Sequence, residues 1–496
     1  MNKTQPFVFI LFGATGDLAS RKIFPALYNL YQSQIISQKI IIIGNSRQPR
    51  SDEDFRRFVL QSLNKYYGAV DLPVWHHLEK RLFFIHGDAK DQLTVKNIFQ
   101  KLNNLSKTGF SVQNRLFHVG IIPEVYPVVL KNLGQSINAY PTSGWQKVMI
   151  EKPFGIDLNS AKTLNRLIAR YFKADDIFRM DHFLAKETVQ NIIAFRFANG
   201  LFEPIWNKDF IDNIQITAFE TQGVDGREIF YDHTGALRDV VQNHVLQILA
   251  ITLMDIPSSL NYQSVRQKTF KILNCLDKIS AKDISSHVVY GQYGRGIICN
   301  KIVRAYIQEE NIKENSRTET YVALKIGLKC KRWQGVPIYI RAGKRMSQNV
   351  TEVSIQFKDP VKNMLLFSKQ MSKTILTIRI QPNEGIILRF DAKKPGFDYQ
   401  LQPSTMEFRY QSAFVNTPII EAYQRLIADA VKGDHILFPN ADSVEAAWKF
   451  ITPLIPNHVK PFDFEIYSGG SSGPFSADKL LENDGRFWFK LSSDIK

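Results

Sequence analysis

The sequence predicts an α/β domain with a doubly wound parallel sheet, followed by an α+β domain with a large, mainly antiparallel sheet. Up to about residue 178, short β-rich runs alternate with helical stretches, whereas later β-rich runs follow one another through short connections. The 496 residues, 44% hydrophobic and 22% charged, suffice for about two or three domains. We expect a first domain at 1–178 and a second at 179–496.

Five apolar runs of the first domain have the composition of buried strands. They are residues 6–12 (PFVFILF), 39–44 (KIIIIG), 81–88 (RLFFIHGD), 114–121 (NRLFHVGI) and the start of 145–155 (WQKVMIEKPFG). A longer periodic stretch follows most of them. This alternation favours a parallel sheet with helices packed on it.

The second domain begins with mixed elements and then becomes mainly extended. We expect a helix at about Lys186–Phe197, a strand at Asp212–Glu220 and a helix at Gly235–Leu253. Further β-rich runs, mostly alternating, are YVALKIGL, VPIYIRAG, EVSIQF, TILTIRIQP and EGIILRF. Their short connections favour antiparallel pairing, with helices on one face of the sheet.

Charge and cysteine content narrow the class of partner and the compartment. The net charge of +16 suits an anionic partner, whether nucleic acid, a membrane surface or a phosphorylated small molecule. Cys275, Cys299 and Cys330 have no CxxC spacing, so we expect neither a zinc site nor a disulfide framework, and a cytoplasmic location. No stretch approaches the roughly 18 apolar residues of a membrane span.

The first apolar run leads into a glycine-rich turn and a helix, the context that a phosphate-binding fingerprint needs. The turn, GATGDLA, is a GxxGxxA variant. Gly13 and Gly16 permit close backbone approach, and the following helix start offers free N–H groups to a pyrophosphate. Taken alone, the turn is equally compatible with a structural role.

The end of the second run distinguishes between nicotinamide cofactors. An NAD site usually has an acidic residue there, whereas this chain has Arg47, Gln48 and Arg50. An arginine at this position favours binding of the 2′-phosphate of NADP. The alternative interpretation is that the arginine is a solvated loop residue without a ligand. Following the turn, it indicates a Rossmann-like domain that binds NADP.

Three further segments carry charged groups. EKPFG (151–155) ends the last predicted strand of the first domain, at the sheet edge where ligands bind. RMDHFLAKE (179–187) precedes a helix, and RDVVQNH (238–244) opens an apolar one. On a helical wheel His244 lies on the apolar stripe and Asp239 on a different side, so this pattern alone predicts a core histidine. Lys152 and Lys186, taken singly, would be surface lysines.

These segments occur in an order that resembles glucose-6-phosphate dehydrogenase: GATGDLA, EKPFG, RMDHFLAKE, FANGLFEPIWN and RDVVQNH. The similarity continues through GVPIYIRAGKRM, EAYQRLI and YSGGSSGPFSADKLLENDGRFW, and so covers nearly the whole chain. The resemblance implies oxidation of glucose 6-phosphate to 6-phosphogluconolactone with hydride transfer to NADP, the first step of the oxidative pentose phosphate pathway. It also implies a homodimer, or a dimer of dimers, formed through the large sheet.

The resemblance also implies residue roles. His244 is the catalytic base for the anomeric hydroxyl, and Asp181 orients its imidazole. The substrate-binding residues are Lys152, His182, Lys186, Glu220, Asp239 and Lys344. The cofactor-binding residues are Gly13, Thr15, Gly16, Asp17, Arg47 and Lys152.

Two positions depart from the family pattern. Phe183 replaces a tyrosine whose hydroxyl reaches the substrate phosphate, and Asn349 stands where the family commonly has a second basic residue. Each lost hydrogen bond to a charged group costs about 1.5–3 kcal/mol, so we expect weaker substrate binding unless Arg345 compensates.

Two other functions stay open as alternatives. A nucleic-acid-binding protein would need clustered Lys and Arg with interleaved aromatics, but the longest basic runs are pairs. The other alternative is a family member that binds nucleotide but has lost its catalytic activity. The presence of Asp181 and His244 argues against it. We therefore expect glucose 6-phosphate and NADP as ligands, and no nucleic acid, membrane or metal.

Overall fold

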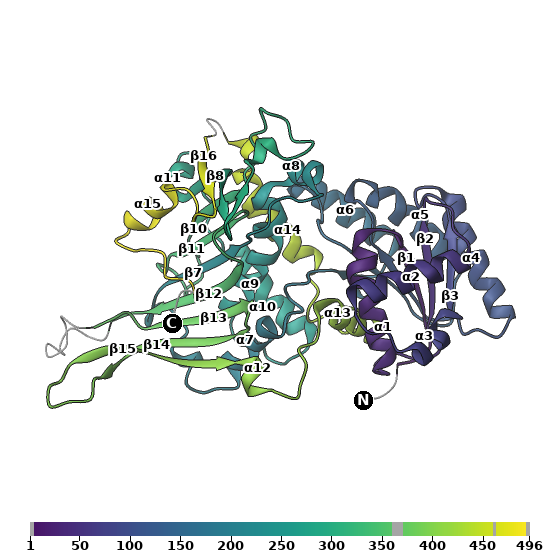
Figure 1. Ribbon diagram of the computed structural model, residues 1–496, viewed down its shortest axis with the longest axis horizontal. Helices are drawn as coiled ribbons and strands as arrows, with labels where there is room; N and C mark the ends of the chain where they lie inside the picture. The colour runs from purple at the N-terminus through teal and green to yellow at the C-terminus, as the bar shows by residue number, and fades with distance from the viewer. Residues whose placement is uncertain (1–3, 360–370, 460–462, 493–496) are drawn as a thin grey trace. The chain divides into compact units, whose positions relative to one another are not determined.

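The computed structural model describes residues 4–359, 371–459 and 463–492 (Figure 1). The chain divides into two compact units. The first comprises Met1–Ala185, Ser259–Arg266 and Ile420–Val444, and the second Lys186–Ser258, Gln267–Ile419 and Glu445–Lys496. The domain boundary at residue 178 stays a prediction.

The first unit is built on a six-stranded sheet in the order β3-β2-β1-β4-β5-β6, with every pair parallel. The strands are β1 (Val8–Phe12), β2 (Ile41–Ser46), β3 (Leu82–His86), β4 (Arg115–Val119), β5 (Gln146–Ile150) and β6 (Ile177–Arg179). The chain winds outward from β1 to β3 and returns to β4 on the other side. The predicted doubly wound sheet is therefore confirmed, and β6 is a short addition to the five predicted strands.

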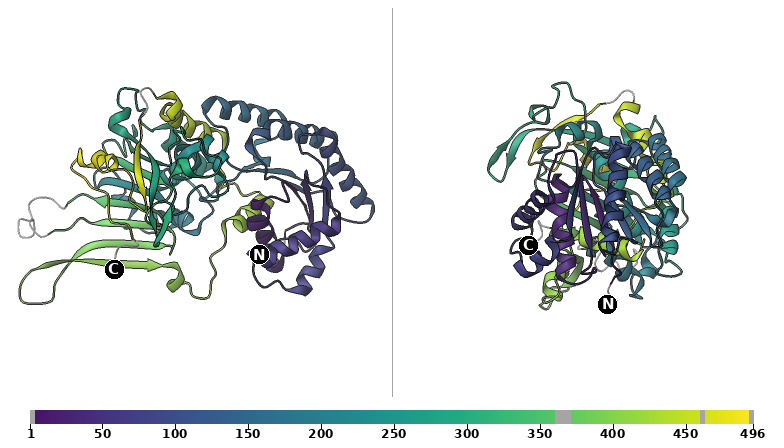
Figure 2. Two further views of the ribbon diagram at one scale, coloured as in Figure 1. Left: turned by 45° about the horizontal axis from the view of Figure 1, so that its top comes forward. Right: turned by 90° about the vertical axis from the view of Figure 1, so that its right-hand side faces the viewer.

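Helices connect these strands and cover the sheet (Figure 2). Because the strand order reverses between β1 and β4, right-handed crossovers place the helices on opposite faces. The helices α1 and α2 pack together, while α4, α5 and α6 form a second group. The bounds are α1 (Phe24–Gln32), α2 (Asp52–Tyr66), α3 (Leu72–Glu79), α4 (Gln92–Lys107), α5 (Tyr126–Ala139), α6 (Leu158–Tyr171) and α13 (Ala422–Lys432), with the π-helical segment η1 (Ala19–Ile23) and the short 3₁₀ turns η2 (Pro123–Val125) and η3 (Ala174–Asp176).

The second unit is built on a ten-stranded sheet in the order β15-β14-β13-β12-β7-β11-β10-β8-β16, with β9 paired to β8. Among the described residues, β7–β11 and β8–β16 pair in parallel and the other pairs are antiparallel. The mainly antiparallel sheet is therefore confirmed. The strands are β7 (Ile211–Phe219), β8 (Val288–Ile298), β9 (Lys301–Val303), β10 (Tyr321–Ile326), β11 (Ile338–Gly343), β12 (Val350–Phe357), β13 (Ile375–Gln381), β14 (Gly385–Lys393), β15 (Leu401–Arg409) and β16 (Glu465–Gly469).

The two faces of this sheet differ in polarity. On β7, Ile214 and Ile216 alternate with Gln215 and Thr217, and all four are buried. The Gln215 side chain donates to the Phe487 carbonyl oxygen (2.9 Å), so the chain's last described segment covers the polar face. The C-terminal helix α15 packs on β8, so helices are not confined to one face as expected.

The helical segments of the second unit include η5 (Leu237–Val245), which carries Asp239 and His244. The helix α7 (Glu187–Phe197) packs on β13, and η5 contacts β7 and β11. The remaining elements of the chain are α8 (Glu228–Ala236), α9 (Leu246–Leu253), α10 (Tyr262–Asn274), α11 (Ile284–His287), α12 (Tyr410–Ala413), α14 (Ala441–Ile451), α15 (Ser476–Glu482) and the short turns η4 (Glu203–Ile205), η6 (Tyr306–Gln308), η7 (Thr452–Leu454) and η8 (Pro456–His458).

Candidate active site

The glycine-rich turn lies at the point where the strand order of the first unit reverses. The backbone N–H groups of Gly13 and Ala14 both donate to the Asn45 carbonyl oxygen at the end of β2 (3.0 Å each). Gly13 has φ +81°, and a Cβ there would approach the Gly120 carbonyl oxygen to 2.3 Å. Only glycine therefore fits at the carboxyl edge of β1 and β4, where doubly wound sheets bind nucleotides.

Arg47 directly follows β2 and is exposed, as a contact to a bound phosphate requires. The nearby acids are used structurally. Asp52 accepts a hydrogen bond from the Phe84 N–H (2.6 Å), and Asp54 joins Ser51 in the capping box of α2. The acid that an NAD ribose usually needs is thus missing from the end of β2, so the residues present fit NADP.

The EKPFG segment is anchored through its glutamate. Glu151 Oε1 lies 3.1 Å from Nε2 of His118, which is fully buried on β4. The Tyr126 hydroxyl donates to the Glu151 carbonyl oxygen (3.0 Å). Two buried side chains from neighbouring elements therefore fix the end of β5, and Lys152 is the next residue along the chain.

The RMDHF block continues from β6, beside β5. Ile150 pairs with Arg179, and the Met180 N–H donates to the Ile150 carbonyl oxygen (2.8 Å). Lys152 and Asp181 therefore follow the ends of adjacent parallel strands. Asp181 is 2% exposed, and its Oδ1 accepts a hydrogen bond from the Phe183 N–H (2.9 Å).

His182 and Phe183 extend this group. The ring centroids of the two residues are 4.9 Å apart, and His182 also stacks on Tyr423 at 6.5 Å. Phe183 is 8% exposed and carries no polar atom at the position of the family's tyrosine hydroxyl. The first unit thus gathers the predicted residues Lys152, Asp181 and His182 at one edge of its sheet.

In the second unit, Lys344 and Glu220 form an ion pair. Both follow strand ends, because Glu220 comes after β7 and Lys344 after β11, its parallel neighbour. Lys344 is 3% exposed, whereas the Glu220 side chain is 44% exposed. Lys344 Nζ also lies 5.2 Å from the centroid of the buried Tyr231 ring. The pair offers a hydroxyl-bearing ligand both a cationic donor and an anionic acceptor.

Asp239 and His244 lie on the helical segment η5, which differs from the expected α-helix. Its hydrogen bonding is of the wide i→i+5 type, and the Leu246 N–H donates to the Val241 carbonyl oxygen. Each residue of such a segment turns through a smaller angle than in an α-helix, so the helical wheel drawn for an α-helix does not describe η5. Both side chains are buried, at 5% and 2% exposure.

Lys186 is placed by the start of α7. It is the N-cap residue of this helix, and its ammonium group donates to the Gln381 side-chain oxygen at the end of β13. The Thr188 hydroxyl donates to the Ile380 carbonyl oxygen (3.2 Å), which fixes the helix start against the same strand.

Asn349, which departs from the family pattern, and Arg345, the residue that could compensate for it, both contact other groups. Asn349 Oδ1 accepts a hydrogen bond from the Thr221 N–H (2.7 Å), next to Glu220. Arg345 Nη2 lies 3.2 Å from an Asp225 carboxylate oxygen and 3.1 Å from one of Glu309. Two carboxylates thus already bind Arg345, which argues against its taking the role of the basic residue that the family has at position 349.

The predicted residues fall into two groups. The first unit carries Gly13, Thr15, Gly16, Asp17, Arg47, Lys152, Asp181 and His182, and the second carries Lys186, Glu220, Asp239, His244 and Lys344. The pairing of Asp181 with His244 stays a prediction.

Sequence reasoning missed supporting residues around Lys344. The Tyr467 hydroxyl donates to the Lys344 carbonyl oxygen (2.7 Å) and contacts the Thr320 hydroxyl (3.0 Å). A tyrosine in a strand usually indicates core packing, so the sequence around Tyr467 did not predict its contact with Lys344. Only its place in the YSGG motif linked it to the family.

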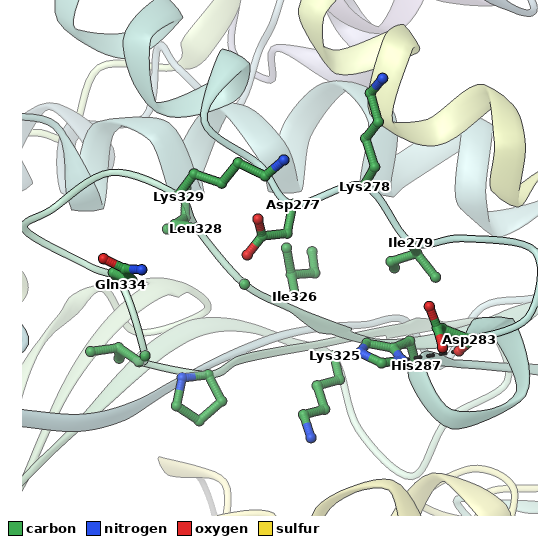
Figure 3. Close-up of a pocket in the computed structure, with 14 residues that line it drawn as sticks. Asp277, Lys278, Ile279, Asp283, His287, Lys325, Ile326, Leu328, Lys329 and Gln334 are labelled. Carbon is green, nitrogen blue, oxygen red and sulfur yellow. Dashed lines mark hydrogen bonds between the residues drawn. The ribbon is translucent and has the colours of Figure 1, made fainter.

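A cavity of about 360 Å³ elsewhere in the second unit contains none of the predicted residues (Figure 3). It is lined by opposite charges, including Asp277, Lys325 and Lys329, and Lys325 also binds Asp484 (2.7 Å). In the part of the chain that the structure describes, no group of three or more His, Cys, Asp or Glu could hold a metal ion. No described helix has the length and apolar character to cross a membrane.

A doubly wound sheet with a glycine-rich turn at its reversal point is the architecture of a dinucleotide-binding protein. Residues 10–191 match the family described as glucose-6-phosphate dehydrogenase, NAD binding domain, and residues 193–489 match its C-terminal domain. The chain belongs to the glucose-6-phosphate dehydrogenase family.

Individual relatives resemble the chain over its whole length. The glucose-6-phosphate 1-dehydrogenase of Aggregatibacter actinomycetemcomitans is 38% identical, covering 100% of this chain and 99% of the relative. That of Bacillus subtilis (strain 168) is also 38% identical, covering 99% of this chain and 99% of the relative. A solved glucose-6-phosphate dehydrogenase in complex with its substrate glucose-6-phosphate has a TM-score of 0.89 at 34% identity, covering 98% of both chains.

Proposed function

We propose that this chain oxidises glucose 6-phosphate at C1 to 6-phosphogluconolactone, with NADP as the hydride acceptor. The observation that carries the proposal is the family match across both units, with His244, Asp181 and the predicted substrate-binding residues present. The reaction would open the oxidative pentose phosphate pathway.

The proposed chemistry requires a base, a partner for that base and a place for the departing hydride. His244 takes the proton of the anomeric hydroxyl, because an imidazole nitrogen can accept a proton in general-base catalysis. Asp181 orients the ring and stabilises the imidazolium that forms. Bound NADP supplies the nicotinamide ring that accepts the hydride released from C1.

The substrate-binding residues divide by charge. Lys186, His182 and Lys152 supply cationic or hydrogen-bonding groups for the phosphate and the sugar near the cofactor. The Lys344–Glu220 pair and Asp239 offer donors and acceptors to the sugar hydroxyls. Buried polar groups of this kind would be left unpaired by a deoxy sugar, so they favour a polyol.

The residues at the end of β2 support a preference for NADP over NAD. Arg47 is exposed there, and Asp52 and Asp54 are occupied by Phe84 and Ser51. An exposed guanidinium without a neighbouring ribose-binding acid favours a 2′-phosphate.

We also propose a cytoplasmic homodimer formed through the large sheet. The strand β15 is at the edge of the sheet, and Met406 on it is 62% exposed. An unpaired edge strand is a ready surface for a second copy. Cys275, Cys299 and Cys330 are all free, which suits a reducing compartment. Light scattering on the purified protein tests the dimer.

The direct test of the function is reduced-nicotinamide absorbance after mixing the protein with glucose 6-phosphate and NADP. We expect an increase that needs both compounds and that fails with 2-deoxyglucose 6-phosphate or glucose. Binding of NADP without turnover would instead favour a catalytically lapsed member. Absence of turnover with either NADP or NAD in folded protein contradicts the proposal.

A further inference from the structure

Glu319 is a buried glutamate that receives two N–H groups at the start of a helix. Its main-chain oxygen accepts from the Ala236 N–H (3.0 Å), and its Oε1 accepts from the Leu237 N–H (3.1 Å). The residue is 2% exposed. A helix leaves its first four N–H groups without partners of its own, so one residue from outside supplies acceptors for two of them.

The chain adapts to this contact at Gly235. With φ +67° and ψ 177°, Gly235 breaks the helix and lets a new one begin at the next residue. A Cβ on residue 235 would lie 2.4 Å from Glu319 Oε1. Glycine is therefore needed both for the backbone conformation and for the approach of the carboxyl group.

The same stretch of chain also holds Lys344. The next residue, Thr320, accepts a hydrogen bond from the Lys344 N–H on its carbonyl oxygen (3.0 Å). The Thr320 hydroxyl in turn accepts from the Tyr293 N–H (2.9 Å). The two consecutive residues Glu319 and Thr320 thus connect the start of η5 with the backbone of Lys344.

The helix start that Glu319 holds is close in sequence to two proposed active-site residues. Asp239 comes two residues after Leu237, and His244 follows on the same wide helical segment. Because a helix moves largely as a rigid element, a shift or rotation at its first residues would be passed to both side chains. A misplacement of about 1 Å at a reacting group can cost about a hundredfold in rate.

We propose that Glu319 is a positioning residue whose carboxyl group fixes the start of η5 against the Lys344 strand end and so places Asp239 and His244. The inference rests on the function proposed above. Glu319 itself contacts neither substrate nor cofactor in this account. Its work requires an acceptor oxygen at the Leu237 N–H, not a negative charge.

The electrostatics of the site agree with an acceptor role. Burial raises the pKa of the Glu319 carboxyl from 4.5 to about 7, against the opposing effects of the Leu237 hydrogen bond and the charge of Arg238. Neutral and ionised forms therefore both occur near neutral pH. A glutamine at this position keeps an acceptor oxygen and removes the ionisation.

The test compares E319A and E319Q with a matched control, E352A. Glu352 is also 2% exposed, its pKa is also raised by burial, and its carboxylate accepts from the Ser492 N–H (3.2 Å). It lies on β12, on the polar sheet face that the C-terminal segment covers. Loss of a buried carboxyl group is therefore common to both alanine variants, whereas contact with η5 belongs to Glu319.

Steady-state kinetics give the first readout. We expect E319A to lower kcat with glucose 6-phosphate by at least about tenfold while KM for NADP changes by less than about twofold. E319Q should recover most of the lost kcat, and E352A should leave kcat close to that of the unmodified chain. Unchanged kcat in E319A, an E319Q as impaired as E319A, or an equal loss in E352A would each overturn the proposal.

Amide hydrogen exchange gives a second readout that does not depend on activity. We expect E319A to speed exchange in peptides covering residues 236–245 and not in those covering β12 and β13, with E319Q restoring slow exchange. Unaltered exchange at 236–245 in E319A overturns the positioning role even if the chain proves to have another substrate. A chain inactive on glucose 6-phosphate that shows the expected exchange pattern refutes only the proposed function.

Discussion

The two units position their predicted site residues in different ways. In the first, the site residues stand in loops directly after parallel strands, and the sheet alone brings those loops to one edge. In the second, they come from two strand ends, two helices and a connecting buried network. A site made by topology can be read from local sequence patterns, whereas a site made by long-range polar contacts cannot.

The difference also concerns tolerance to change. The nucleotide turn depends on backbone shape, as at Gly13, where any side chain would strike the Gly120 carbonyl group. The sugar half depends on buried charged groups, such as Lys344 at 3% exposure, whose partners must all be present. We therefore expect substitutions in the second unit to act through proton transfer and electrostatics, and those at the nucleotide turn and Arg47 to act through cofactor recognition.

The largest expected effect is that of H244N, which removes the proposed base from the second unit. General-base catalysis contributes about 10²–10⁴-fold, so kcat should fall by that range while KM for NADP stays nearly unchanged. Stopped-time assays at high enzyme concentration measure the residual rate. A kcat within a few-fold of the unmodified enzyme would remove His244 from the mechanism.

The next largest effect is on the free energy of unfolding, and it measures what ionisation of the buried Glu319 carboxyl group costs the folded state. Because the pKa of Glu319 is raised from 4.5 to about 7, its contribution is fully present below pH 4.5 and is lost as the pH rises through 7. We expect the free energy of unfolding of E319Q, relative to the unmodified chain, to increase by about 2–3 kcal/mol between pH 5 and pH 8.5.

Urea unfolding at both pH values measures this change, and E352Q serves as a second buried-carboxyl comparison. The direction follows from the sign of the shift, since the folded state binds the Glu319 proton more tightly than the unfolded chain does. A difference between E319Q and the unmodified chain that is the same at both pH values contradicts the account.

In the first unit, R47A should abolish most of the preference for NADP over NAD. Loss of a charge-assisted contact costs about 1.5–3 kcal/mol, which corresponds to about tenfold or more in kcat/KM with NADP. The rate with NAD should change little, because NAD has no 2′-phosphate. Equal preference ratios before and after the substitution would show that another group recognises the 2′-phosphate.

The smallest effect is expected from F183Y, which restores a hydroxyl beside His182. We expect KM for glucose 6-phosphate to fall by about tenfold, because a hydrogen bond to the phosphate would be added without a change in the reacting groups. The KM for NADP is the internal control. If KM for glucose 6-phosphate is unaltered, other groups already satisfy the phosphate.

The sequence predicted the parallel sheet well because β1 to β5 each contain a run of apolar residues, as in VFILF of β1 and LFFI of β3. It did not predict β8, whose run contains Gly291, Gly294 and Gly296, or β15, which is mostly exposed and polar. Both strands form because a neighbouring strand offers them hydrogen bonds, which is information that lies outside the segment itself.

Recognition of the candidate site was similarly uneven. The turn at Gly13 and the exposed Arg47 were identifiable from strand, glycine and charge patterns alone. The pattern alone predicted a core histidine at 244, and the side chain is indeed buried; its catalytic role rests on the family resemblance and stays a prediction. Glu319 gave no local signal, since its partners Ala236 and Leu237 are more than eighty positions away in the sequence.

The proposed pairing of Asp181 with His244 is tested most directly by a double-mutant cycle with D181N and H244N, using kcat with glucose 6-phosphate and NADP. If Asp181 acts through His244, the double variant should be about as slow as the slower single variant. Losses that multiply independently would contradict the claim and separate the two residues.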